Sequence, residues 1–208
     1  MDAVGWWFAR VPASGAAPAR LIAVVSGAHP DGSYVDVPAD QAPTATVGWC
    51  AAADLVDGAV TALHVASSLV PAAPPLWYAE LRESAARPPA VHLVALSGHG
   101  QPAGGLLDET ALSNVAVTSA DQLGAVRWYP ATGEVDQVYV DPAHRRLRIG
   151  TGLLHAAGML CVARGWSRLW GDGQRTAMGE AFRNASYWRE RGADLTHVAP
   201  PMTPGEVG

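Results

Sequence analysis

The chain contains no lysine: all 14 of its basic residues are arginine, and its 208 residues carry a formal net charge of −5. The absence of lysine excludes a P-loop, because the motif G-x-x-x-x-G-K-[ST] places a lysine on the phosphates. The acidic balance argues against broad binding to nucleic acid, which needs an extended basic face. Nucleic acid is therefore disfavoured as a partner, although a local basic spot is allowed.

Cysteine and long apolar runs are scarce as well. Cys50 and Cys161 are the two cysteines; they can form at most one disulfide, and their spacing does not fit a metal site. The histidines show neither H-x-x-x-H nor H-E-x-x-H spacing, so no metal is expected. No apolar stretch reaches 18 residues, and the start "VGWWFARV" does not resemble a signal peptide. We therefore expect a cytoplasmic protein without a membrane segment.

No internal repeat is evident along the chain, and its first half is the harder to interpret. The segments "GWWFARV" and "RLIAVVSG" predict strands or extended arms within residues 1–50. Apolar residues at roughly helical spacing predict helices over 51–69 and over 75–86, the second of which begins after two prolines. The apolar run "VHLVALSG" at 91–98 predicts a buried strand.

The second half alternates strands and helices. Runs rich in β-branched and aromatic residues predict an antiparallel meander of three strands, 114–119, 123–130 and 135–140. An apolar stripe predicts a helix over 151–164 that ends at Gly165. A short strand "SRLWG", a helix "TAMGEAFRNASYWRER" and a last strand "LTHVAP" follow. This order of elements predicts an α/β (α+β) fold.

Positive charge is concentrated between the last meander strand and the next helix, in "DPAHRRLRIGTG". The N-terminus of a helix offers unpaired N–H groups and a favourable dipole to an anion such as phosphate. Arg145, Arg146 and Arg148 add permanent charge suited to a diphosphate. A dinucleotide fingerprint does not fit, because His155 stands where G-x-G-x-x-G has its third glycine. The alternative is a solvated basic turn whose glycines only allow close packing of helix and strand.

The same segment follows a known pattern: V-x-P, then Q/R-x-x-G-x-G/A, then two aliphatic residues, here "VDPAHRRLRIGTGLL". In this pattern the chain resembles the GNAT superfamily of acyl-CoA-dependent N-acyltransferases. The likeness covers 113–199 in the order of elements and is specific over about 134–154. One departure is that Arg148 occupies the position of the first glycine.

The resemblance implies the GNAT fold, a mixed, mostly antiparallel sheet flanked by helices. We expect a single domain over 1–208, in which 113–199 form the acyl-CoA-binding core. Residues 1–50 would be an N-terminal extension or the first strands, and 200–208 a tail.

The resemblance also implies where acetyl-CoA binds. In relatives the strand before the turn bulges and pairs its main chain with the pantetheine arm, which assigns that arm to Val138, Tyr139 and Val140. Asn184 would take part of the role of a family asparagine. The diphosphate would be held by the residues of the turn, namely Arg145, Arg146, Leu147, Arg148, Ile149, Gly150 and Thr151.

Acyl transfer to an amine needs a base for the attacking nitrogen and an acid for the leaving thiolate. Many relatives carry a glutamate where this chain has Glu134, which makes it the first candidate base. Asp136, two residues further along the same strand, is the second candidate. Either could instead be a solvent-facing charge at the strand edge. For the acid the resemblance implies Tyr187, although Trp188 occupies the tyrosine position of the family.

The expected activity is transfer of an acetyl group from acetyl-CoA to a primary amine, by direct attack. The acceptor would be a small molecule or a peptide, and a homodimer is left open. Two alternatives stay open: a non-catalytic acyl-CoA-binding module, and a GNAT-type enzyme that modifies tRNA or other nucleic acid.

Overall fold

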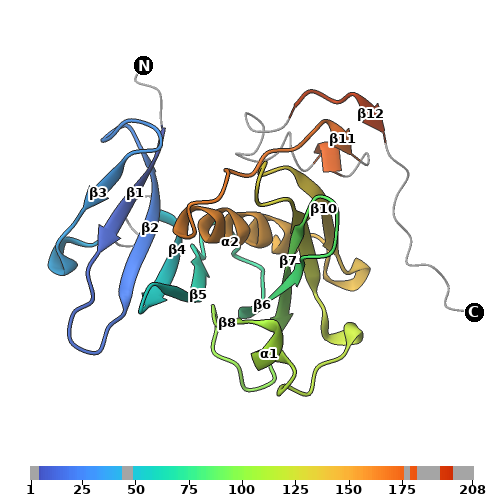
Figure 1. The fold of residues 1–208 in the computed structure, drawn as a ribbon, viewed down its shortest axis with the longest axis horizontal. Helices are drawn as coiled ribbons and strands as arrows, with labels where there is room; N and C mark the ends of the chain where they lie inside the picture. Colours follow the sequence, from blue (N-terminus) through green and yellow to red (C-terminus); the bar gives the residue numbers. More distant parts are fainter. Residues whose placement is uncertain (1–4, 44–48, 176–178, 182–192, 199–208) are drawn as a thin grey trace, which may run out of the picture.

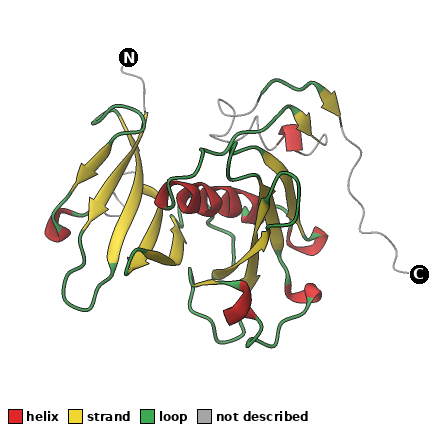
Figure 2. Ribbon diagram, viewed as in Figure 1, coloured by secondary structure: helices red, strands yellow, loops and turns green. Residues whose placement is uncertain are grey.

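The computed structural model describes residues 5–43, 49–175, 179–181 and 193–198. Two sheets of five strands each lie on either side of one long helix, α2 (Ile149–Ala163) (Figure 1). The other described helices are short (Figure 2). The expected α/β class is thus confirmed, with sheets that are mixed but mostly antiparallel.

The first sheet is formed by the N-terminal strands, in the spatial order β3-β1-β2-β4-β5. Only β1 and β3 pair in parallel. The strands are β1 (Gly5–Val11), β2 (Ala19–Ser26), β3 (Tyr34–Asp36), β4 (Trp49–Val56) and β5 (Ala59–Val65).

The second sheet has the order β8-β6-β7-β9-β10, in which only β6 and β8 are parallel. A short helix, α1 (Glu109–Leu112), packs beside β6 and β8. Two further short strands, β11 (Gln174–Arg175) and β12 (His197–Val198), pair with each other. The strands of the second sheet are β6 (Leu76–Glu83), β7 (Ala90–Ser97), β8 (Leu106–Leu107), β9 (Gly124–Trp128) and β10 (Val135–Val140).

The two sheets repeat one arrangement, strand for strand. β1 to β5 stand in the same order and directions as β6 to β10. The register agrees too: Phe8 pairs with Ala23 on the next strand, as Tyr78 pairs with Ala95. The chain therefore contains an internal structural repeat, which corrects the expectation of none.

The repeat extends to a local irregularity. In the hairpin of β4 and β5 the pairing passes over Thr61, and in the hairpin of β9 and β10 it passes over Asp136. The two hairpins differ at their outer edges. The edge of β5 is covered by the segment before β8, where Leu63 N donates to Gly104 O at 2.7 Å and Gly105 forms a bridge to Ala62. No described segment covers most of the edge of β10 in this way.

One apolar core joins both sheets to α2. It contains Phe8 and Leu63 from the first sheet, Leu93 and Trp128 from the second, and Leu153 from the helix. Because both sheets cover α2, most of its residues are buried. At the end of α2, Arg164 forms an ion pair with the buried Glu80 of β6, which Arg82 also contacts at 2.8 Å.

The structure corrects two expected helices. Residues 51–69 form most of the β4–β5 hairpin, whose turn at Asp57 and Gly58 has positive φ at both residues, as a type I′ turn requires. Residues 75–86 contain β6, which is buried on both faces because α2 covers one face and α1 the other. Both segments place apolar residues on both faces of their sheet. Their sequences therefore lack the alternation of apolar and polar residues that would have indicated a strand.

Other expected elements agree more closely. The predicted strands at β1, β2, β7, β9 and β10 and the predicted helix at α2 are confirmed. Residues 114–119 do not form a strand; they lead into a short 3-10 helix (Ser119–Asp121). Most of the predicted helix "TAMGEAFRNASYWRER" lies outside the described residues. None of the helices in the described parts is long and apolar enough to cross a membrane.

Candidate acyl-CoA site

β10 has the bulge that the resemblance implies. Its register with β9 shifts between Val135 and Gln137, so Asp136 is the extra residue. β10 is also the edge strand of its sheet. Within the described ranges, no strand pairs with its other edge between Asp136 and Val140, a length of about 13 Å at ~3.3 Å per residue. This free edge offers main-chain groups to a strand-like ligand.

The chain that returns after α2 meets β10 at one point only. Val135 N donates to Trp170 O at 2.8 Å, and Trp170 N donates to Gly133 O at 2.9 Å. These bonds form a parallel bridge between Glu134 and Trp170. The next strand pair, β11, bonds to β12 instead. Within the described residues the predicted strand "SRLWG" therefore meets β10 at the bridge of Trp170 alone, and the described chain beyond it pairs as β11 with β12.

The turn between β10 and α2 presents main-chain donors. Asp141 caps a 3-10 helix (Pro142–His144) by accepting from Ala143 N at 2.8 Å. From Arg145 to Thr151, no main-chain N–H donates a hydrogen bond to another described residue. The Arg145 side chain lies across the end of β10, where its Nε donates to Val140 O at 3.3 Å. Free N–H groups and guanidinium charge at a helix N-terminus can hold a diphosphate.

Arg148, the departure from the family pattern, is the N-cap residue of α2 and has φ 64° and ψ 16°. Arg146 also has a positive φ, 67°. The left-handed region costs an ordinary side chain roughly 1–2 kcal/mol, while glycine adopts it freely. The family glycine at this position therefore has a backbone reason, and this chain adopts the same conformation with an arginine.

Replacing Arg148 by glycine is expected to raise the free energy of unfolding by about 1 kcal/mol, because glycine relieves the left-handed strain. Chemical denaturation of the unliganded protein measures this change. Arg145→Gly is the matched control, since Arg145 has an ordinary φ of −65°. A gain at Arg145 as large as at Arg148 would contradict the explanation by backbone strain.

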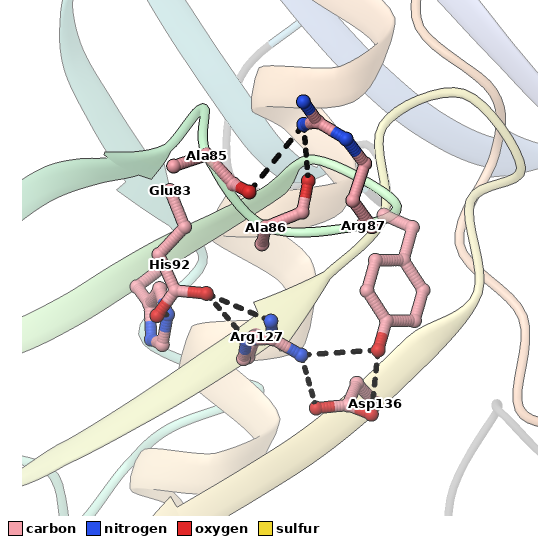
Figure 3. Close-up of polar contacts among 8 residues, drawn as sticks. Glu83, Ala85, Ala86, Arg87, His92, Arg127 and Asp136 are labelled. Atoms are coloured by element: carbon pink, nitrogen blue, oxygen red, sulfur yellow. Dashed lines mark hydrogen bonds and ion pairs between the residues drawn. The ribbon is translucent and has the colours of Figure 1, made fainter.

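The two candidate bases lie in different surroundings. Asp136 Oδ2 accepts from Arg127 Nη1 at 2.6 Å, and its Oδ1 accepts from the Tyr129 hydroxyl at 3.0 Å (Figure 3). Both oxygens of Asp136 are therefore engaged. The Glu134 carboxylate makes no side-chain hydrogen bond or ion pair with a described residue, and Glu134 is half-buried. Glu134 is the better placed of the two to accept a proton.

Arg127 connects four strands on the sheet face away from α2 (Figure 3). Its Nη2 contacts Glu83 Oε2 at 2.7 Å, and His92 contacts the other oxygen of Glu83 at 2.7 Å. Hydrogen bonds from Arg127 and His92 lower the pKa of Glu83, and those to Glu83 and Asp136 raise the pKa of Arg127. Sequence reasoning missed this network. The sequence feature that could have indicated the network is the presence of charged residues and a histidine on adjacent strands, at positions that face away from the core.

The remaining predicted site residues differ in how far they are buried, and two of them lie outside the described residues. Val138 is 42% exposed on β10, and Val140 packs against the core close to the turn. Leu147 also packs against the core, and Ile149 and Thr151 are buried in the first turn of α2. The candidate acid Tyr187 and the cofactor residue Asn184 lie outside the described residues, so both stay predictions.

The cysteines and the described acidic and histidine residues suggest no second chemistry. Neither Cys50 nor Cys161 forms a disulfide in the described residues and both are buried, and burial raises the pKa of the Cys50 thiol to about 11 and of the Cys161 thiol to about 12. In the described ranges, no group of three or more His, Cys, Asp or Glu residues is placed to hold a metal ion.

In a comparison with family models, the model of the acetyltransferase (GNAT) family matches residues 59–179, more than half of the chain. No curated protein and no solved structure matches significantly. The matched span contains the bulged strand, the arginine-rich turn and α2, and the mixed α/β architecture agrees with the GNAT fold. On this match and this geometry, the chain belongs to the GNAT family of acetyltransferases.

Proposed function

We propose that this protein is an N-acetyltransferase that moves an acetyl group from acetyl-CoA to a primary amine. The observation that supports the proposal is the bulged edge of β10, which no described strand pairs with from Asp136 to Val140 and which leads directly into a turn, Arg145 to Thr151, whose N–H groups have no partner among the described residues. A thioester donor with a diphosphate at one end and an amide-rich arm matches both features. Family membership supports the acyltransferase class.

In this proposal the diphosphate lies on the turn and at the start of α2. The pantetheine arm follows β10 from Val140 past Val138 toward the bulge, and its amides pair with the unpaired strand edge. The thioester then lies near Asp136, close to the bridge between Glu134 and Trp170. Glu134 accepts a proton from the protonated amine, and the free nitrogen then attacks the carbonyl carbon. The thiolate of CoA leaves, and Tyr187 is the proposed acid that protonates it.

Binding of the donor is tested by thermal unfolding. Acetyl-CoA at about 100 times its Kd is expected to raise the melting temperature by about 5–10 °C, since a ligand of the native state stabilises it by mass action. Arg145→Ala should raise the Kd by about 10–100-fold, the range for losing a hydrogen bond to a charged group. Arg10→Ala is the control, because Arg10 lies on the other sheet, where it forms an exposed ion pair with Asp36 and packs over the Tyr34 ring. If Arg145→Ala and Arg10→Ala had the same Kd for acetyl-CoA, the assignment of the diphosphate to the turn would be wrong.

The alternative of a non-catalytic acyl-CoA-binding module shares this binding prediction but not turnover. Release of free CoA that depends on added acceptor, screened over small amines, peptides and nucleosides, separates the two. Binding without turnover over the whole panel would favour the module. The proposed setting is the cytoplasm.

A further inference from the structure

An exposed tryptophan stands beside the candidate base. Trp170 is 39% exposed, whereas its chain neighbour Leu169 is 2% exposed and lies in the core. The indole is also fixed in orientation, because its Nε1 donates to Thr132 O at 3.0 Å. A large aromatic ring held in place at the surface presents one face to a ligand at little cost in side-chain entropy.

The bridge places this ring next to Glu134. Bridged residues on neighbouring strands lie about 4.8 Å apart and direct their side chains to the same face of the sheet. Glu134 and Trp170 form such a pair. Together they offer a carboxylate without a partner among the described residues and an indole face, on the side of the sheet that carries Asp136 and Arg127.

Tyr129 borders Glu134 on the opposite side, where its main-chain N donates to Glu134 O at 3.0 Å. Its ring is already covered, however, since the Arg127 guanidinium lies 5.2 Å from the ring centroid. Its hydroxyl is bonded to Asp136 and Arg127. Trp170 is thus the aromatic neighbour of Glu134 that no cation of the described chain occupies.

We propose that Trp170 and Glu134 form an ammonium-binding site for the acceptor, in which the cation packs on the indole face and the carboxylate faces the nitrogen. Indole is the aromatic ring that attracts cations most strongly. The acceptor class is therefore an alkylamine that arrives protonated, rather than an uncharged aryl amine or an alcohol. This inference rests on the proposed function, because Glu134 then receives the proton of the bound ammonium before the nitrogen attacks.

The test measures binding without turnover, with choline and its uncharged isostere 3,3-dimethylbutan-1-ol as probes. Neither probe has a nitrogen that can be acylated. Ligand-observed NMR titration of the full chain should show choline binding about fivefold more tightly, the scale of an exposed cation–π contact. Trp170→Leu should abolish this preference and Trp170→Phe should keep most of it. Melting temperatures of the variants show whether each one is folded.

Tyr129→Phe is the matched control, and its preference for choline should equal that of the unmodified protein. Equal binding of the two probes, no binding of choline, or an unchanged preference in Trp170→Leu would each overturn the ammonium site. The acetyl-CoA melting shift is measured separately. Its absence would reject the proposed function, whereas a normal shift with no choline preference would reject only the acceptor site.

Discussion

Replacing Glu134 by glutamine is expected to lower the turnover number by about 10²–10⁴-fold, the usual contribution of one general acid or base. Glutamine keeps the shape of the side chain and removes only the proton acceptor. The Kd for acetyl-CoA should stay nearly unchanged, because the proposed contacts of the donor are with the turn and the strand edge. Steady-state kinetics with a saturating primary amine, together with donor titration, measure both quantities.

The pH dependence of this defect separates two roles of Glu134. An amine with a pKa near ~10 arrives increasingly deprotonated as the pH rises, so a missing base matters less. The ratio of the two turnover numbers should therefore shrink toward high pH. A ratio that is constant with pH would assign Glu134 to positioning of the acceptor. Asp136→Asn is the matched control on the same strand, and a larger defect there would move the base to Asp136.

Replacing Glu80 by glutamine is expected to lower the free energy of unfolding by about 1.5–3 kcal/mol, the cost of losing hydrogen bonds between charged groups. Glu80 is 5% exposed and faces two guanidinium groups, from Arg164 and Arg82. Chemical denaturation at neutral pH measures the loss. Asp36→Asn is the control, because the exposed pair of Asp36 with Arg10 should contribute at most about 1 kcal/mol.

The difference in the free energy of unfolding between the unmodified protein and Glu80→Gln should become smaller at acid pH. Burial by itself raises the pKa of Glu80, but the hydrogen bonds from Arg164 and Arg82 outweigh it and hold the pKa below its ordinary value of 4.5. The ion pair therefore contributes fully above about pH 4.5 and is lost as the pH falls through the lowered pKa. A Glu80→Gln defect that stays constant into strong acid would show that the glutamine disturbs packing rather than charge.

The local sequence predicted the second half of the chain better than the first. Around β10 and α2, the turn residues, the glycines and the apolar stripe all indicate the same structure, and the predicted elements formed there. Around β4 and β6 the apolar residues point to both sides of the sheet, so helical and extended spacing could not be told apart. The pair Asp57 and Gly58 does distinguish the two, because Asp-Gly favours the hairpin turn, with positive φ at both residues, that the structure contains.

The site could be predicted from the sequence only where its residues are consecutive in the chain. Arg145 to Thr151 are consecutive, so their arrangement at the start of α2 follows from the strand, turn and helix around them. Trp170 lies 36 residues from Glu134 in the sequence, and its contact depends on how the segment after α2 returns to the sheet. No local pattern reports such a bridge. The network of Arg127 and Glu83 likewise depends on strand order, and the apolar spacing predicts a helix where β6 contributes Glu83 to that sheet.

The shared position of α2 between two sheets has a consequence for the dynamics of the site. The helix that follows the proposed donor-binding turn is supported on one side by strands β4 and β5 and on the other by β7, β9 and β10. An opening fluctuation of the N-terminal sheet is therefore expected to loosen the helix whose first turn is proposed to receive the phosphates. By thermodynamic reciprocity, a donor bound there slows exchange of the amide hydrogens in β4 and β5, which it never touches. The strands ahead of the family match thus belong to the same cooperative unit as the chemistry.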